Sequence, residues 1–211
     1  MRFFITFEGI EGCGKTTQIN HLASFLEKKG QLFLLTREPG GTKLGEKIRE
    51  ILLLAHNDQI APWAELFLYL ADRVQHYHQI ILPALQEDKI VLCDRFIDAT
   101  LAYQGFGRQL DLNWLEEIHL RSMGKIKPNL TFLLDLPPEE GLKRAWLRIA
   151  KQKIKEDRFE KEGLDFHKRV REGYLFLAQR EPERFVILNG LQDENSLHQE
   201  ILRHLPQELY S

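Results

Sequence analysis

The chain has 211 residues, 43% of them hydrophobic and 28% charged, with a formal net charge of −2 and an isoelectric point near 6.5. This composition fits one soluble α/β domain and lacks the surplus of basic residues expected of a nucleic-acid-binding protein. Because every apolar run is short, we expect no signal peptide, no membrane span and a cytoplasmic location.

The first predicted elements are a buried strand and a glycine-rich loop. Residues 3–7 are β-branched or aromatic, residues 9–16 match the pattern G-x-x-x-x-G-K-[ST], and apolar residues at helical spacing follow as far as Gly30. In such a loop the backbone N–H groups converge on a phosphate at the N-terminus of a helix. The alternative, a glycine-rich turn with a chance lysine, leaves the flanking strand and helix without a reason.

We therefore predict that this loop binds a nucleoside triphosphate. Lys15 adds a positive charge, and the hydroxyl of Thr16 adds an oxygen ligand for magnesium. The predicted contacts are Gly9, Ile10, Glu11, Gly12, Cys13, Gly14, Lys15, Thr16 and Thr17.

A second predicted strand, residues 32–35, leads into the segment TREPGGT at residues 36–42. Arg37 and Glu38 in this segment are candidates to contact a ligand. The same letters also suit a plain loop before a helix, and turn chemistry does not exclude that interpretation.

Helical patterns follow at residues 44–55 and 62–86, and Pro83 is expected to kink or end the second of them. Tyr69 and Arg73 lie four residues apart and so share one face of that helix. They either stack on a base and grip its phosphate, or they pack in the core beside a surface ion pair. The spacing alone favours packing.

A third strand, residues 90–93, delivers Asp94 at its carboxyl end. This placement suits a carboxylate that holds magnesium, directly or through water, and Arg95 next to it suits a bidentate contact with a second phosphate. An ordinary ion pair at the end of a strand is the alternative. The only two cysteines, Cys13 and Cys93, have no metal-ligand spacing and are expected to be reduced thiols.

Further strands are predicted at residues 130–136 and 185–188, and a strongly basic stretch lies between them at residues 141–160. Arg144 and Arg148 share a helical face in this stretch. It is either a solvated surface or the source of cations for a transferring phosphoryl group. Its irregular part, at about residues 149–163, is a candidate mobile lid.

Strands and helices thus alternate along the chain, and the strands are almost continuously apolar. This pattern predicts an α/β fold with a parallel sheet covered by helices on both faces and with ligands at the carboxyl ends of the strands. No linker divides the chain, so residues 1–211 are expected to form a single domain.

Five segments, in order, carry a resemblance to a known family: EGIEGCGKTT, TREPGGT, DRFIDATLAYQG, PNLTFLLDL and EDRFE. At this spacing the chain resembles the bacterial thymidylate kinases over essentially its whole length. The resemblance implies a P-loop kinase fold with a five-stranded parallel sheet and a lid. It implies transfer of the γ-phosphoryl group of ATP to dTMP, giving dTDP, with Mg²⁺ as cofactor and a homodimer as the assembly.

The resemblance also implies roles for individual residues. Arg49, Arg73 and Arg95 look like ligands of the dTMP phosphate, Tyr69 like the ring stacked on thymine, and Tyr103 and Glu11 like contacts of the sugar. The catalytic set is Lys15, Arg95, Arg148, Glu11 and Asp94; magnesium is assigned to Thr16 and Asp94, and Arg144 to ATP. The dTMP set is Glu38, Arg49, Tyr69, Arg73, Arg95, Thr100, Tyr103, Gln104, Asp157 and Glu160.

Two positions depart from the family pattern, because residue 69 is more often phenylalanine and residue 100 more often serine or asparagine. Either exchange can retune base preference without changing the reaction. The alternatives are a kinase for another nucleoside monophosphate or a deoxynucleoside, and a non-catalytic nucleotide-binding module. A signalling GTPase would need a guanine-reading Asn/Thr-Lys-x-Asp segment, which the sequence lacks.

Overall fold

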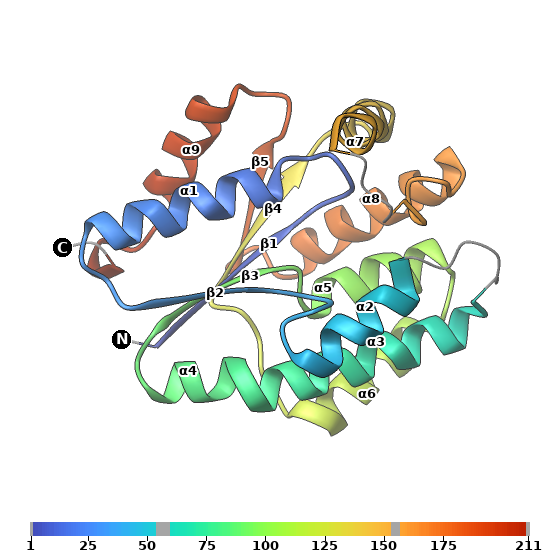
Figure 1. The fold of residues 1–211 in the computed structure, drawn as a ribbon, viewed down its shortest axis with the longest axis horizontal. Helices are drawn as coiled ribbons and strands as arrows, with labels where there is room; N and C mark the ends of the chain where they lie inside the picture. Colours follow the sequence, from blue (N-terminus) through green and yellow to red (C-terminus); the bar gives the residue numbers. More distant parts are fainter. Residues whose placement is uncertain (1, 54–59, 153–156, 210–211) are drawn as a thin grey trace.

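The short apolar runs become five strands of one sheet in the computed structural model, which describes residues 2–53, 60–152 and 157–209 (Figure 1). The strands are β1 (Phe3–Glu8), β2 (Phe33–Arg37), β3 (Ile90–Asp94), β4 (Leu130–Asp135) and β5 (Phe185–Asn189). Their order is β2-β3-β1-β4-β5, and every neighbouring pair is parallel. The predicted fold class is confirmed.

Helices cover both faces of this sheet, as Figure 1 shows, with α1 and α9 on one face and α4 and α8 on the other. The helices are α1 (Lys15–Lys28), α2 (Lys43–Leu53), α3 (Pro62–His76), α4 (Leu82–Gln86), α5 (Ile97–Thr100), α6 (Leu112–Met123), α7 (Pro138–Gln152), α8 (Leu164–Arg180) and α9 (Glu194–Arg203). Two π-helical turns, η1 (Tyr77–Ile81) and η2 (Leu101–Gly107), and a 3₁₀ turn, η3 (Gln207–Leu209), complete the order. Within the described ranges, none of these helices has the length and apolarity to cross a membrane.

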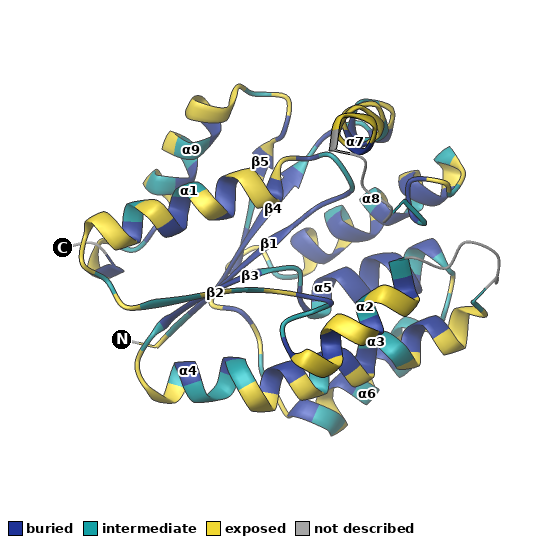
Figure 2. Cartoon of the chain, in the orientation of Figure 1, coloured by how far each residue is buried: buried dark blue, intermediate teal, exposed yellow. Residues whose placement is uncertain are grey.

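The central strands β1, β3 and β4 are buried almost throughout, which is why their sequences are nearly continuous apolar runs, whereas the edge strands β2 and β5 are partly exposed (Figure 2). Successive side chains face opposite layers: Ile5 packs with the apolar face of α1, whereas Phe4 packs with Ile81 of η1. Cys13 and Cys93 are both free and buried.

Two expectations about boundaries need correction, and a third lies partly outside the described residues. Pro83 does not end the helix predicted at 62–86, because α3, η1 and α4 follow one another without a break. The wide turn η1, which ends at Ile81, lets the helix accommodate Pro83, a residue that has no N–H. The helix predicted at 44–55 is described only to Leu53, since residues 54–59 lie outside the described residues. The irregular stretch predicted at 149–163 begins later, because α7 continues to Gln152; residues 153–156 are outside the described part.

All five strands end on a polar or charged residue at the same edge of the sheet. These residues are Glu8, Arg37, Asp94, Asp135 and Asn189. The parallel register aligns them, since Phe7 and Arg37 both stand opposite Asp94, and Asp135 stands opposite Asn189. The fold therefore gathers charge at the edge where ligands bind in such sheets.

A buried ion pair fixes the turn that follows β3 to the rest of the sheet. Arg184, just before β5, donates two hydrogen bonds of 2.7 and 2.8 Å to Asp98 of α5, and a third of 2.8 Å to Thr131 of β4. Both charged side chains are at least nine-tenths buried. The pair joins α5 to the amino-terminal ends of β4 and β5.

We expect Arg184→Leu to lower the free energy of unfolding by about 3–5 kcal/mol, because Asp98 then stays buried without its cation. Urea unfolding followed by circular dichroism measures this loss. Arg180→Leu is the matched control: its pair with Glu116 leaves both side chains more than a third exposed, so the loss there should be about 0–1 kcal/mol. Equal losses in the two variants would contradict the prediction.

Candidate functional site

A cleft of about 720 Å³ opens at the charged edge of the sheet. It is lined by the loop after β1, the segments after β2 and β3, and side chains from α2, α3, η2 and α7. The charged side chains among its lining residues are Lys15, Arg37, Arg49, Arg73, Arg95, Arg144 and Arg148, against Glu11, Glu38, Asp94 and Glu160. Seven cations facing four carboxylates make a site for a polyanion.

The structure brings nearly all of the predicted site residues into this one cleft. Three lie outside its lining. Gly9 and Ile10 contribute backbone carbonyls beneath the loop, and Asp157 instead pairs with Lys161 at 2.8 Å. The prediction that Asp157 faces the ligand is therefore not supported by its position. Pro39, Leu53, Ala99 and Phe159 line the cleft and were not predicted.

The glycine-rich loop between β1 and α1 has the curled backbone that phosphate binding requires. Gly9, Gly12 and Gly14 all have positive φ angles. Gly12 also lies so close to α7 that a Cβ atom there would approach the carbonyl oxygen of Gly141 to 2.0 Å. The loop is thus closed on one side by the N-terminal end of α7.

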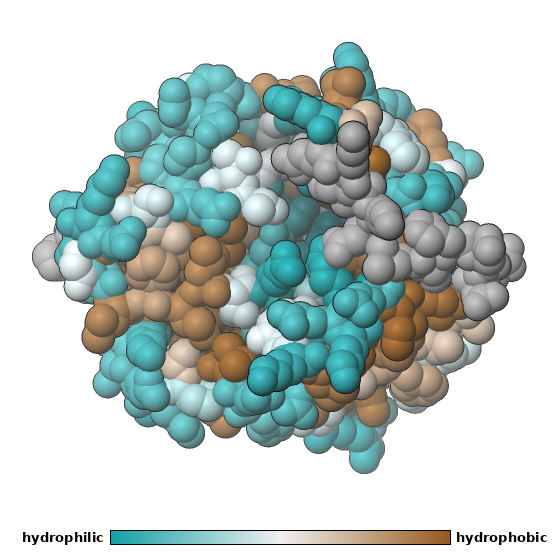
Figure 3. All heavy atoms as spheres, viewed as in Figure 1, coloured by the Kyte–Doolittle hydropathy of each residue, from teal (hydrophilic) through white to brown (hydrophobic). Residues whose placement is uncertain are grey.

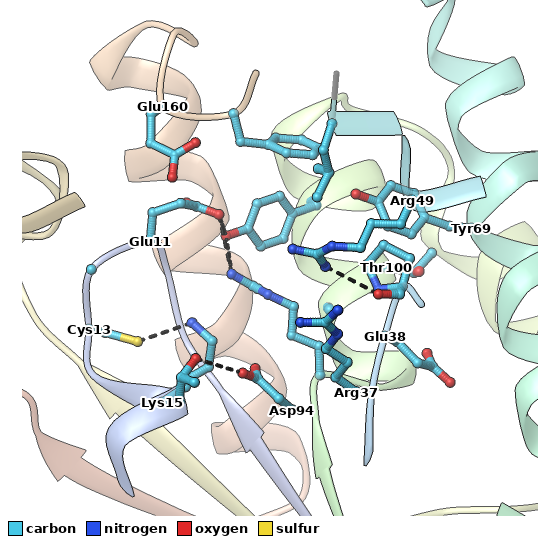
Figure 4. A pocket seen from close by; sticks show the side chains of 18 of the residues that line it. Glu11, Cys13, Lys15, Arg37, Glu38, Arg49, Tyr69, Asp94, Thr100 and Glu160 are labelled. Atoms are coloured by element: carbon cyan, nitrogen blue, oxygen red, sulfur yellow. Dashed lines mark hydrogen bonds and ion pairs between the residues drawn. The ribbon is translucent and has the colours of Figure 1, made fainter. Parts of the chain in front are cut away.

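Lys15 is folded back into this loop, as Figure 4 shows for its contact with Cys13. Its Nζ donates to the carbonyl oxygens of Gly9 and Ile10, both at 2.9 Å, and to Sγ of Cys13 at 3.2 Å. All three ammonium hydrogens are therefore directed at the loop itself. A phosphate that binds here must replace at least one of these contacts.

Two oxygen-bearing side chains meet beside the loop. The hydroxyl of Thr16, at the start of α1, donates to Oδ2 of Asp94, at the end of β3, over 3.1 Å (Figure 4). Hydroxyl and carboxylate oxygens are hard ligands of the kind that Mg²⁺ prefers. This pair therefore fits the predicted metal-binding residues.

Arg95 points into the centre of the cleft from an unusual backbone position. Its φ angle is +72°, and its N–H donates to the carbonyl of Phe7 at 3.1 Å. One terminal nitrogen, Nη2, donates to Glu11 at 3.2 Å and to the hydroxyl of Tyr103 at 3.0 Å. The other, Nη1, donates to the hydroxyl of Tyr174 at 3.0 Å. The guanidinium is thus fixed by three partners from three separate elements.

Glu11 holds its negative charge strongly in this arrangement. Its Oε1 accepts a 2.5 Å hydrogen bond from Tyr103, and its Oε2 lies 3.3 Å from Nδ1 of His167. Burial alone would raise the pKa of Glu11, but His167 and Arg95 outweigh burial and lower the pKa to about 2. Glu11 is therefore ionised throughout the physiological range.

Arg73 of α3 is almost completely enclosed, at 1% exposure, although it lines the floor of the cleft. Its Nε donates to Glu38 at 2.6 Å, and its Nη1 contacts the hydroxyl of Thr100 at 2.5 Å and Nε2 of His119 at 2.9 Å. Nδ1 of His119 lies 2.6 Å from the carbonyl of Leu115. That nitrogen must donate to the carbonyl, so Nε2 is the acceptor for Arg73.

The ionisation states around Arg73 agree with this geometry. Burial, followed by the charge of Arg73, lowers the pKa of His119 to about 3, which keeps the imidazole neutral. Burial would raise the pKa of Glu38, but Arg73 and His76 lower it overall. A neutral acceptor and an anionic acceptor therefore share one buried cation.

Gln104, predicted to lie near the base, is held by a carboxylate that was not predicted. Its amide nitrogen donates to Glu65 of α3 at 2.7 Å. Glu65 is fully buried and also accepts hydrogen bonds from Arg108 and Arg158. Tyr69, which Figure 4 labels, lies one turn further along α3 and lines the same cleft as the amide of Gln104.

The other half of the cleft carries the arginines of α7. Arg144 donates to the carbonyl of Gly190, in the loop after β5, at 2.8 Å. Arg148 lies one helical turn further and reaches Glu160 over 3.5 Å, while about half of its side chain stays exposed. Burial and the charge of Glu11 raise the pKa of Glu160.

Several residues that support the site escaped the sequence analysis. Glu8 had a signal, because it is the polar end of an apolar strand directly before the glycine loop. His119, Glu65 and Tyr174 had none, because each reaches the site from a helix whose packing the sequence does not specify. Known motifs find the residues that face the cleft, but not the acceptors behind them.

Comparison with known proteins matches residues 7–201 to the family model described as thymidylate kinase. A protein named thymidylate kinase from Desulfosudis oleivorans is 55% identical and covers 89% of this chain and 89% of its own length. One from Geobacter sp. (strain M21) is 52% identical over 99% of this chain and 95% of its own. The solved thymidylate kinase structure from Ehrlichia chaffeensis matches with a TM-score of 0.75 at 35% identity, over 95% of this chain and 96% of that chain.

Proposed function

This chain belongs to the thymidylate kinase family, whose members transfer the γ-phosphoryl group of ATP to dTMP, and on that premise we propose how its cleft divides between the two substrates. The observation that carries the proposal is the meeting of a phosphate-binding loop and six arginines in one cleft of about 720 Å³. That volume lies within the range of ordinary ligand pockets and is continuous from the loop to Tyr69.

ATP takes the half of the cleft beside the glycine-rich loop. The loop amides and Lys15 hold its β- and γ-phosphates, and Arg144 and Arg148 of α7 lie on the same side. The support for this assignment is the loop geometry, together with Lys15 and the two arginines lining the same cleft. In this proposal Arg148, near the end of α7, contacts the γ-phosphoryl group.

The acceptor dTMP takes the half formed by α2, α3 and η2. Arg49, Arg73 and Arg95 surround its phosphate, and Tyr69 stacks on its base. The contacts of the sugar and base come from residues that line this half of the cleft: Glu11, Glu38, Thr100, Tyr103, Gln104 and Glu160.

The proposed cofactor is Mg²⁺, held by Thr16 and Asp94. These residues fit the ion, because their oxygens lie 3.1 Å apart beside the phosphate loop. When bound, the ion would neutralise charge on the phosphates of ATP.

The reaction requires the protein to position the two substrates and does not require a general base. A phosphate monoester has a second pKa of about 6, so the attacking oxygen of dTMP is largely ionised at neutral pH. The remaining barrier is the repulsion between two polyanions that must come into line. Lys15, Arg95 and Arg148 meet that need by placing positive charge between the two halves of the cleft.

We expect the protein with MgATP to phosphorylate dTMP much faster than UMP, GMP, AMP or thymidine, because the arginine set requires a phosphate on the acceptor and Tyr103 crowds the sugar. A coupled assay of ADP release with each acceptor measures the preference. If UMP or thymidine is the best acceptor, the substrate assignment is wrong; if no acceptor raises ADP release, the site does not act as a kinase.

Arg148→Ala should lower kcat by about tenfold to a thousandfold, because arginines that contact a transferring phosphoryl group act mainly in the transition state. Arg148→Lys should recover only part of this loss, since an ammonium lacks the bidentate fork. Lys143→Ala is the control, as Lys143 is an exposed cation on the same helix but does not line the cleft. Wild-type kcat in Arg148→Ala would remove Arg148 from the mechanism.

The proposed assembly is a cytoplasmic homodimer. The two free cysteines support a reducing compartment. Exposed aromatic and aliphatic side chains on adjoining helices support a dimer surface: Trp63 and Phe67 of α3 form one cluster with Trp114 of α6, and Ile51 of α2 is also exposed. Figure 3 shows hydrophobic surface gathered near the ends of α2 and α3.

Sedimentation velocity should give twice the 24.8 kDa chain mass. Phe67→Glu should shift the protein towards the monomer, because it places a charge in the centre of the aromatic cluster. Leu32→Glu, at another exposed apolar position outside these helices, is the control and should leave the mass unchanged. A monomeric wild-type protein would refute the homodimer.

A further inference from the structure

Arg95 is supported from behind by two buried side chains that do not line the cleft, and we propose that these residues, Glu8 and Tyr174, position Arg95 for phosphoryl transfer. This inference rests on the proposed role of Arg95 in holding the acceptor phosphate. Glu8 is the last residue of β1, and Tyr174 comes from the middle of α8. Their exposures are 0% and 1%, and neither is among the residues that line the cleft.

The hydrogen bonds from Arg95 to Tyr174 and from Tyr174 to Glu8 form a chain in which each group donates to the next. Nη1 of Arg95 donates to the hydroxyl oxygen of Tyr174 at 3.0 Å, and that hydroxyl donates to Oε2 of Glu8 at 2.7 Å. An arginine can only donate, and a tyrosine hydroxyl has one hydrogen. Because the tyrosine gives that hydrogen to Glu8, its oxygen is left to accept from Arg95.

Glu8 also fixes the backbone that carries Arg95. Its other oxygen, Oε1, accepts from the N–H of Phe96 at 2.7 Å, while the N–H of Arg95 donates to the carbonyl of Phe7 at 3.1 Å. The end of β1 therefore holds Arg95 twice, through two consecutive peptide N–H groups and through the hydroxyl of Tyr174. The main chain of Arg95 has a φ angle of +72°, which most residues avoid, so it depends on such restraints.

Arg95 needs this support because its partners on the cleft side change when substrate arrives. In the free protein its Nη2 donates to Glu11 and Tyr103. A phosphate bound between these groups competes for that nitrogen, whereas Nη1 keeps its contact with Tyr174 away from the cleft. The Tyr174 contact is thus the one that persists through binding and sets the direction in which Nη2 points.

The charge state of Glu8 makes the arrangement sensitive to pH. The groups that face Glu8 are Asp98 of α5, Arg95, Tyr174 of α8 and the thiol of Cys93 of β3. Burial, followed by the charge of Asp98, raises the pKa of Glu8 to about 8, against the opposing effect of Arg95. As the pH falls through that value Glu8 gains a proton, so one of its oxygens becomes a donor and the negative charge that accepts from Tyr174 and Phe96 is lost. The support for Arg95 is therefore complete at alkaline pH and weakens as the pH falls.

Tyr174→Phe should lower kcat/KM for dTMP by about tenfold, the effect of losing one hydrogen bond to a charged group, while the KM for ATP stays within about twofold. Tyr77→Phe is the matched control, because Tyr77 is a buried tyrosine in η1 whose ring packs against His78 and which does not line the cleft. Steady-state kinetics at saturating ATP measure the first value, and at saturating dTMP the second.

Glu8→Gln provides a second variant of nearly the same shape. Its amide can accept from only one of the two donors, so kcat/KM for dTMP should fall by about the same factor at pH 9. The ratio of wild-type to variant kcat/KM should shrink from pH 9 to pH 6.5, because the wild-type enzyme loses its own support over this interval. Glu87→Gln, an exposed glutamate paired with Lys89, is the control. Ionisation of the dTMP phosphate affects both enzymes alike and cancels in the ratio.

The outcomes separate cleanly. If the wild-type protein does not phosphorylate dTMP, the proposed function fails. If it does, and Tyr174→Phe and Glu8→Gln lose only melting temperature while their kcat/KM per folded enzyme equals that of the controls, then Glu8 and Tyr174 are structural and the inference is wrong. A loss confined to the KM for ATP would also overturn it.

Discussion

The structure depends on one electrostatic constraint, which is that several guanidinium groups must be kept together in a cleft before any anion arrives to neutralise them. Each buried arginine has left bulk water, and its desolvation is tolerated only where acceptors surround it. Arg73 has Glu38, Thr100 and His119, and Arg95 has Glu11 and two tyrosines. The acceptors are as much a part of the site as the cations.

The parallel sheet brings those acceptors to the arginines. Five strands end at one edge, so that Glu8 and Asp94 meet the glycine loop there, and the helices behind the edge reach in with the rest. Holding the cations beforehand reduces the reorganisation that remains when substrates bind, which is where preorganised sites gain most of their advantage. The same logic explains the neutral His119: a protonated imidazole would repel Arg73, and burial prevents that protonation.

The sequence predicted the strands, the phosphate loop and the pair Thr16–Asp94 because each depends on local pattern and on a strand end. It left Tyr69 and Arg73 between two interpretations, and the structure shows why spacing was not decisive. Arg73 is as buried as a core residue and yet lines the cleft. His119 and Tyr174 lie 46 and 79 residues from the arginines they contact, and no single-sequence pattern connects such distant positions. Pro83 does not end its helix, which was one of the two outcomes expected, because α4 follows the wide turn η1 without a break, and residue preferences do not reveal such a turn.

The contact between the phosphate loop and α7 sets the point about which that helix can tilt. Gly12 and Gly141 allow the two backbones to touch, so α7 has its pivot at the phosphate loop, while its far end at Gln152 lies about 16 Å away along the helix axis. A tilt of roughly ten degrees about the pivot moves that end by about 3 Å and moves Arg144 by much less. In such a tilt Arg144, close to the pivot, would stay nearly in place, and Arg148, further along the helix, would be displaced more. Larger side chains at either glycine would push α7 away from the phosphate loop and change how far its end moves, without altering any charge.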